Sequence, residues 1–198
     1  MMGLILLTFF NFGYLVNFPT TYIPAVGSSE LEFRFGAKGK VIGRIGVSPF
    51  ENFFFGISYG GENILGSGTP TYHSSPGVQI KFGTQSSKLS FAVGFDSEKY
   101  EGSPTGFYGV LGGDLGWALI PYGGVNYQDS LGVFFGAEAG ISNSLSLVSE
   151  GSFKKDNFIL NAGLRWKFEE QVILEFDFKD ILSKEPIRAL KFSYTEYI

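Results

Sequence analysis

Residues 158–168 read Phe-Ile-Leu-Asn-Ala-Gly-Leu-Arg-Trp-Lys-Phe, and residues 172–178 read Val-Ile-Leu-Glu-Phe-Asp-Phe. In both stretches every second side chain is apolar, and the charged side chains fall between them: Arg165, Lys167, Glu175 and Asp177. Successive side chains of a β-strand point to opposite faces, so a period of two predicts strands with one apolar and one polar face. These two stretches therefore indicate an all-β fold.

The same alternation recurs along the chain and predicts about twelve strands, with about ten as the alternative number. Each strand is close to the roughly 9–11 residues that a tilted membrane strand requires. The pattern fits an antiparallel up-and-down transmembrane β-barrel over residues 19–198. The predicted strands cover residues 29–36, 40–48, 52–60, 77–84, 88–97, 106–116, 119–128, 131–141, 144–152, 157–168, 171–179 and 187–196.

The connections between the predicted strands alternate in length. The long connections, residues 61–76, 97–105 and 180–186, all follow odd-numbered strands, whereas connections after even-numbered strands are short. Outer-membrane barrels have short periplasmic turns and longer outer loops, so this parity is the one they predict. A soluble sandwich has no reason to show it, and we expect both termini at the periplasmic end.

The two faces of the predicted strands differ in charge. The apolar face is almost free of charge, and aromatic side chains such as Tyr59 and Trp166 lie near strand ends, as in the girdles of membrane barrels. A soluble barrel has its apolar face inside instead. We therefore expect the polar face to line the lumen. The lumen-facing charged residues are predicted to be Glu30, Glu32, Arg34, Arg44, Lys81, Asp96, Glu138, Arg165, Lys167, Glu175, Asp177 and Lys191.

The composition supports a membrane barrel and excludes several functions. The chain holds 28 Gly, 22 Phe and 10 Tyr, but only 17% of its 198 residues are charged, which is low for a soluble domain. It has no Cys, which excludes disulfides and Cys-based metal sites. Its net charge of −4 argues against a nucleic-acid partner. No cofactor fingerprint and no metal-ligand histidine pair is present, so we expect neither cofactor nor metal.

Residues 1–18 form a separate N-terminal segment. Its apolar run from Leu4 to Val16 has about the length of a signal peptide and is too short and interrupted for a transmembrane helix. It lacks a basic start and a clean cleavage site. The segment is therefore predicted to be a signal peptide, with a hydrophobic N-terminal arm as the alternative.

Three short motifs have catalytic or metal-binding alternatives. Residues 56–60 match the Gly-x-Ser-x-Gly string of a nucleophile elbow, with Ser58 at its centre and the only histidine, His73, in the next loop. Residues 152–155 match Ser-x-x-Lys but fall at a predicted hairpin, which indicates a solvated turn. Carboxylates at the outer rim could gather a cation, but their spacing fits no known calcium loop and favours solvated side chains: Asp96, Glu98 and Glu101.

Three further stretches carry a family resemblance. Residues 18–47, 54–61 and 106–111, together with 131–147, resemble uncharacterised bacterial outer-membrane barrels of the YjbH-type family. The resemblance implies a link to exopolysaccharide secretion. The C-terminal residues 191–198 resemble the aromatic signal read by the barrel assembly machinery, but end in Ile instead of Phe.

Together these observations predict a non-enzymatic protein of the bacterial outer membrane, in contact with the lipid bilayer. It is expected to be a narrow pore or an envelope or export component linked to polysaccharide secretion. The lumen charges are balanced, so they either select solutes along a channel or pair with one another and fill it. The alternatives are an outer-membrane hydrolase that uses Ser58 and His73, and a soluble β-barrel that binds an apolar ligand.

Overall fold

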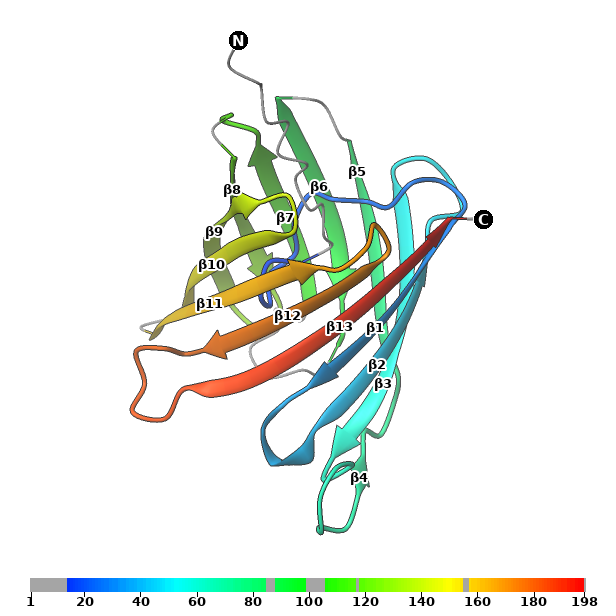
Figure 1. Cartoon of the computed structure of the whole chain (residues 1–198), viewed down its shortest axis with the longest axis vertical. Coiled ribbons are helices and arrows are strands. Elements are labelled where there is room, and N and C mark those ends of the chain that lie inside the picture. The colour runs from blue at the N-terminus through cyan, green and yellow to red at the C-terminus, as the bar shows by residue number, and fades with distance from the viewer. Residues whose placement is uncertain (1–13, 85–87, 99–105, 117, 155–156, 198) are drawn as a thin grey trace.

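In the computed structural model, which describes residues 14–84, 88–98, 106–116, 118–154 and 157–197, the strands form one antiparallel sheet (Figure 1). Twelve of its thirteen strands close into a ring, because β1 pairs with both β2 and β13 and β2 also pairs with β3. This confirms the predicted twelve-stranded all-β barrel. The strands are β1 Ser28–Phe35, β2 Val41–Val47, β3 Phe53–Glu62, β4 Thr71–Tyr72, β5 Gly77–Thr84, β6 Leu89–Asp96, β7 Gly106–Gly113, β8 Leu119–Tyr127, β9 Leu131–Ser142, β10 Leu145–Lys154, β11 Asn157–Lys167, β12 Val172–Lys179 and β13 Ile187–Tyr197.

The ring is an up-and-down barrel, since each ring strand pairs with the ring strands before and after it in sequence. Ser28 at the start of β1 lies opposite Tyr197 at the end of β13, so the first strand begins and the last strand ends at the same end of the barrel. The extra strand β4 pairs with Gly61 and Glu62 at the end of β3 and lies outside the ring. Its two residues are too few to give a periodic signal in the sequence.

The strand ends lie within three residues of the predicted ones, and two of the differences have a local reason. β7 ends at Gly113 instead of residue 116, because Asp114 turns the chain by accepting a hydrogen bond from the N–H of Gly116 at 2.7 Å. β10 continues to Lys154 instead of residue 152, because its ladder with β11 extends to the Lys154–Asn157 pair. A 3₁₀ turn, Ala37–Gly39, lies between β1 and β2. Within the described ranges, no helix is long and apolar enough to cross a membrane.

The outer surface of the ring is apolar. Side chains exposed on it come from alternate strand positions, and those that face inward between them are buried. Such a surface suits contact with lipid, where a closed ring also leaves no strand edge with unsatisfied backbone groups. Exposed outward-facing side chains include Ile45, Ile57, Phe82, Phe91, Val93, Phe107, Leu111, Val125, Val133, Phe135, Leu147, Leu164, Trp166 and Phe176.

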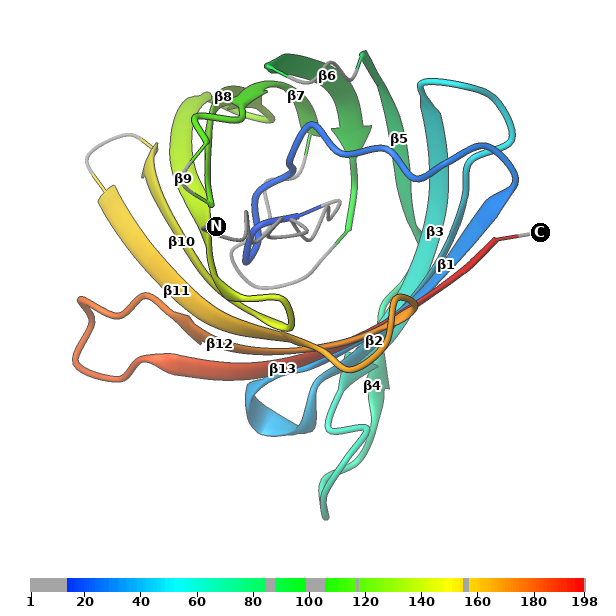
Figure 2. The same ribbon diagram turned by 45° about the horizontal axis from the view of Figure 1, so that its top comes forward.

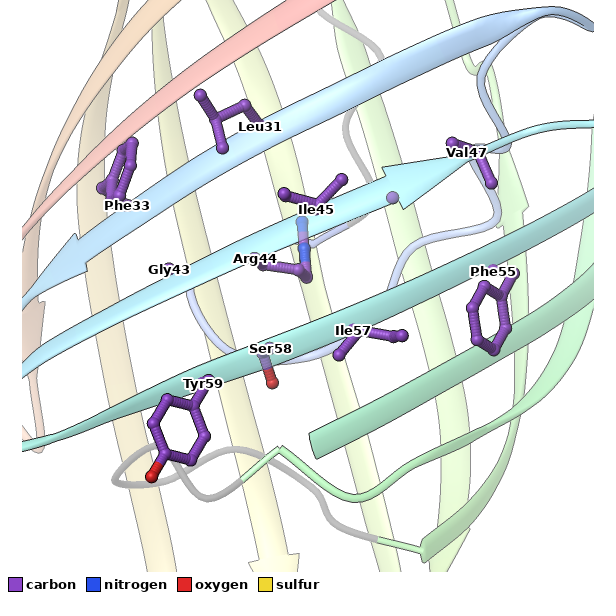
Figure 3. Close-up of a pocket in the computed structure, with 11 residues that line it drawn as sticks. Leu31, Phe33, Gly43, Arg44, Ile45, Val47, Phe55, Ile57, Ser58 and Tyr59 are labelled. Atoms are coloured by element: carbon purple, nitrogen blue, oxygen red, sulfur yellow. The ribbon is translucent and has the colours of Figure 1, made fainter. Parts of the chain in front are cut away.

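A groove of about 570 Å³ crosses the outer surface over β1, β2 and β3 (Figure 3). It forms beside Gly43, where a side chain is missing next to the ring of Phe33. Ile45 and Ile57 line the groove and are 62% and 47% exposed, whereas Arg44 is 3% exposed and is directed away from them. The groove therefore belongs to the lipid-facing surface and not to the lumen.

Because the outer face is apolar, the loss of stability caused by an added charged side chain should depend on its position. Replacing Val93, which lies in the middle of β6 and is 47% exposed, with Arg should lower the free energy of unfolding by about 2–4 kcal/mol, because the charge would sit in the hydrocarbon layer. Urea titration of protein folded into liposomes measures this. Leu182→Arg, in the connection between β12 and β13, is the matched control and should change stability by no more than about 0.5 kcal/mol. Equal losses for both variants would contradict a lipid-facing β6.

Candidate functional site: the barrel lumen

The inner face of the ring collects most of the buried charge of the protein. Inward positions are polar because they alternate with the apolar outward positions of the same strands. In the described residues, eight acidic and seven basic side chains are buried. They are Glu30, Glu32, Asp96, Glu98, Glu138, Glu150, Glu175 and Asp177, with Arg34, Lys40, Arg44, Lys81, Arg165, Lys179 and Lys191.

One ion-pair cluster joins β9, β11, β12 and β13. Arg165 contacts Glu138 through Nη1 at 2.7 Å and Glu175 through Nε, and Lys191 Nζ lies 2.5 Å from Glu175. Sheet register brings these groups together, because Glu175 lies directly opposite both Arg165 and Lys191. Ser146 completes the cluster by donating to Glu138 at 2.9 Å.

A second ion-pair cluster lies across β1 and β2. Arg44 Nη2 contacts Glu30 at 2.5 Å and Glu32 at 3.0 Å, and Arg34 Nε contacts Glu32 at 2.5 Å. Arg34 also pairs with Glu98, which follows β6, at 2.9 Å. Glu32 and Arg44 are direct neighbours in the ladder between β1 and β2. Both clusters therefore contain charges that are paired within the wall of the barrel, as buried charges require.

The N-terminal segment occupies the lumen between these clusters. Figure 2 shows the described part of the N-terminal segment starting inside the ring of strands and passing over its rim to β1, and residues 14–21 are all buried. Tyr14 and Pro19 form an isolated β-bridge, and the N–H of Leu15 donates to the carbonyl of Phe18 at 2.9 Å, so the segment makes a tight turn. The structure thus places the last residues of the predicted N-terminal segment inside the barrel.

Wall side chains bind the backbone of this turn. Glu150 accepts hydrogen bonds from the N–H groups of Val16, Asn17 and Phe18 at 2.9–3.0 Å. On the carbonyl side of the turn, donors from the wall reach backbone oxygens. Arg165 Nη2 reaches Tyr14 and Leu15 at 2.9 and 3.0 Å, and Lys191 Nζ reaches Leu15 and Val16 at 3.3 and 3.4 Å.

The side chain of Tyr14 is held at the second cluster. The guanidinium carbons of Arg34 and Arg44 each lie 4.8 Å from the centre of its ring, which is the geometry of a cation–π contact. Its hydroxyl donates to Asp96 and accepts from Gln79. Tyr14 therefore links the segment to β1, β2, β5 and β6.

The structure places the twelve predicted lumen charges in two groups. Eleven are buried, but Lys167, at the end of β11, is half-exposed. Four buried charged residues were not among the predicted lumen charges: Lys40, Glu98, Glu150 and Lys179. Glu150 shares its side of β10 with Ser146 and Val148, opposite Leu145 and Leu147, so the alternation of that strand contained the signal.

The other candidate motifs do not form the sites that they suggest. Ser58 lies in the middle of β3, which continues to Glu62, so the strand does not bend into a helix as a nucleophile elbow must. His73 is half-buried, and its backbone N–H donates to the carbonyl of Gly60. The interpretation of Ser152 as part of a solvated turn is wrong, because Ser152 is buried in β10; Lys155 lies outside the described residues.

The rim carboxylates also differ from their interpretation as solvated groups. Asp96 and Glu98 are 1% and 3% exposed and bind Tyr14 and Arg34, because the inner wall surrounds them. Glu101 lies outside the described residues. Across the described ranges, no group of three or more His, Cys, Asp or Glu side chains is placed to hold a metal ion.

The fold is that of known porins. The KdgM porin has a TM-score of 0.57 at 11% identity, with 84% of this chain and 98% of that chain covered. The NanC porin has a TM-score of 0.51 at 9% identity, with 86% of this chain and 99% of that chain covered. Omp33 of Acinetobacter baumannii has a TM-score of 0.51 at 8% identity, with 86% of this chain and 97% of that chain covered. No protein-family model and no curated protein matches the chain, so the resemblance to YjbH-type barrels stays a prediction. The chain therefore has the barrel fold of these outer-membrane proteins.

The ion-pair cluster of β9, β11, β12 and β13 predicts that one substitution in it strongly lowers the stability of the barrel. Arg165→Gln should lower the free energy of unfolding by about 3–5 kcal/mol, because Glu138 and Glu175 would remain buried without their shared guanidinium. Urea-induced unfolding in detergent micelles, followed by tryptophan fluorescence, measures the change. Lys167→Gln on the same strand is the control and should cost no more than about 0.5 kcal/mol. A loss below about 1 kcal/mol for Arg165→Gln would contradict a buried cluster.

Proposed function

We propose that this protein is a narrow, non-enzymatic channel of the outer membrane for small polar solutes. The observation that carries the proposal is the balanced set of eight acidic and seven basic buried side chains on or beside the inner face. A ring with an apolar outside and a charged inside is the arrangement of a pore wall. Twelve strands give a lumen between that of side-chain-filled small barrels and that of open porins.

The balance of charge narrows the class of solute. One structure of the KdgM porin contains disordered oligogalacturonate, which is a chain of carboxylated sugars. Paired wall charges of both signs offer such a polyanion no excess of cations. We therefore propose neutral or zwitterionic polar solutes for this chain, with short carbohydrates as the leading class. A role in polysaccharide export, which the YjbH-type resemblance implies, is the more specific form of this proposal.

The proposal predicts weak ion selectivity. In planar bilayers with a tenfold KCl gradient, the reversal potential should stay close to zero, far from the limit of about 59 mV for a perfectly selective pore. Lys81→Glu, on the inner face, should shift the potential toward cation selectivity, because it adds negative charge to the lumen.

The control for this shift is Lys38→Glu, in the exposed connection between β1 and β2, which should leave the potential unchanged. A wild-type reversal potential near either limit would contradict a balanced lumen. Liposome swelling in neutral sugars tests the solute class, and entry of charged sugars alone would refute it.

A further inference from the structure

We propose that residues 14–21 are a resident plug of the mature barrel, which closes the channel until the turn is released from Glu150. This inference rests on the proposed function, because a plug regulates a channel. Its basis is that three different parts of the lumen wall each match a different side of the same short segment.

The acidic part of the wall matches the N–H side of the turn. Three successive N–H groups, from Val16 to Phe18, converge on the carboxylate of Glu150, which is the arrangement of a backbone anion nest. A fourth donor is Nδ2 of Asn161 at 2.7 Å. Glu150 is 1% exposed, so water does not supply its hydrogen bonds. Three of its four described hydrogen-bond donors belong to the N-terminal segment, and one belongs to the barrel. The position of Glu150 is therefore explained by the segment that it binds.

The basic part of the wall matches the carbonyl side of the turn. Arg165 and Lys191 already pair with carboxylates of the wall, yet both also direct donors at carbonyl oxygens of residues 14–16. Lys179 Nζ adds a hydrogen bond of 2.6 Å to the side chain of Asn17. Because cations lie on the carbonyl side and the carboxylate on the N–H side, the wall fixes the direction of the bound segment.

The third part of the wall is apolar. Leu15, Val16 and Phe18 pack in one buried cluster with inner-face residues of β6 to β10, and the rings of Phe18 and Phe134 stack with their centres 4.7 Å apart. An apolar patch of this kind on the wall of a water-filled pore would be left in contact with water. The wall residues of the cluster are Ala92, Tyr108, Val110, Ile120, Tyr122, Phe134 and Val148.

The backbone of the barrel also leaves room for the segment. At Gly136 on β9, a Cβ atom would lie 2.4 Å from the carbonyl oxygen of Ser149 on β10 and 2.5 Å from Cδ1 of Leu15, which is closer than real side chains approach. The glycine at this inward position therefore leaves space both for the backbone of β10 and for Leu15. If a signal peptide is removed, the plug requires that cleavage falls before Tyr14, and not at the predicted boundary after Phe18.

The first test measures where the segment lies in protein extracted from outer membranes. Thr21 Oγ1 and Ser90 Oγ are 2.6 Å apart, so the pair Thr21→Cys and Ser90→Cys should form a disulfide in this otherwise cysteine-free chain. The control pair Thr21→Cys and Val93→Cys should not, because Val93 faces lipid. The intact mass of the wild-type protein should include residues 14–18. A mature chain that begins at residue 19 or later, or no disulfide in the first pair, would overturn the plug.

The second test measures conductance in planar bilayers. Glu150→Gln removes the charge that binds three N–H groups, and should raise the fraction of time in the open state at least about tenfold. Glu51→Gln, in the exposed turn between β2 and β3, should have no effect. In a Glu150→Gln protein that also carries the Thr21–Ser90 disulfide, the pore should remain closed until dithiothreitol is added.

A third variant separates failure of the plug from failure of the channel. Leu15→Gly, Val16→Gly and Phe18→Gly, combined with Glu150→Gln, remove both the apolar and the acidic contacts of the segment. If this protein folds with a heat-modifiable gel shift yet conducts no ions, the proposed channel function is wrong. If the wild-type protein conducts as well as this variant, the channel stands and the plug is overturned.

Discussion

Closure of the ring by hydrogen bonds between β1 and β13 is the constraint on which the rest of the structure depends. In hydrocarbon no water can satisfy a free strand edge, so a chain of short strands is stable there as a closed barrel. Ser28 to Phe35 pair with Leu190 to Tyr197, and this register joins the first strand to the last. Closure then fixes an inside and an outside, because the side chains of every strand alternate between them.

Closure gives the barrel a polar inner face, and the charged side chains buried there need neighbours of opposite charge. Charges that leave water need partners, and the ladder supplies them by placing Glu175 opposite both Arg165 and Lys191, and Glu32 opposite Arg44. The inner face of β6 to β10 also carries an apolar patch, and the N-terminal segment packs against it. Figure 2 makes the consequence visible, since the segment lies within the ring that a solute would have to cross.

The sequence allowed the fold to be predicted because alternation and loop parity are local and repeat many times. Residues 158–168 show the period without help from the rest of the chain. Most of the buried charged residues could be predicted from the same alternation. Glu150 was not predicted, because the alternation is weaker in β10. The contacts of Tyr14 with Arg34, Arg44 and Asp96 could not be predicted, since they join residues far apart in sequence through a segment that has no period.

The central claim is that one face of every strand meets lipid and the other faces the lumen, and spin-label accessibility along β6 tests it most directly. The chain has no cysteine, so single cysteines from Leu89 to Asp96 can each carry one nitroxide in liposome-embedded protein. We predict a period of two, with collisions with oxygen high at Phe91, Val93 and Phe95 and low at Ser90 and Ala92. The opposite phase, or no oscillation, would contradict a membrane barrel.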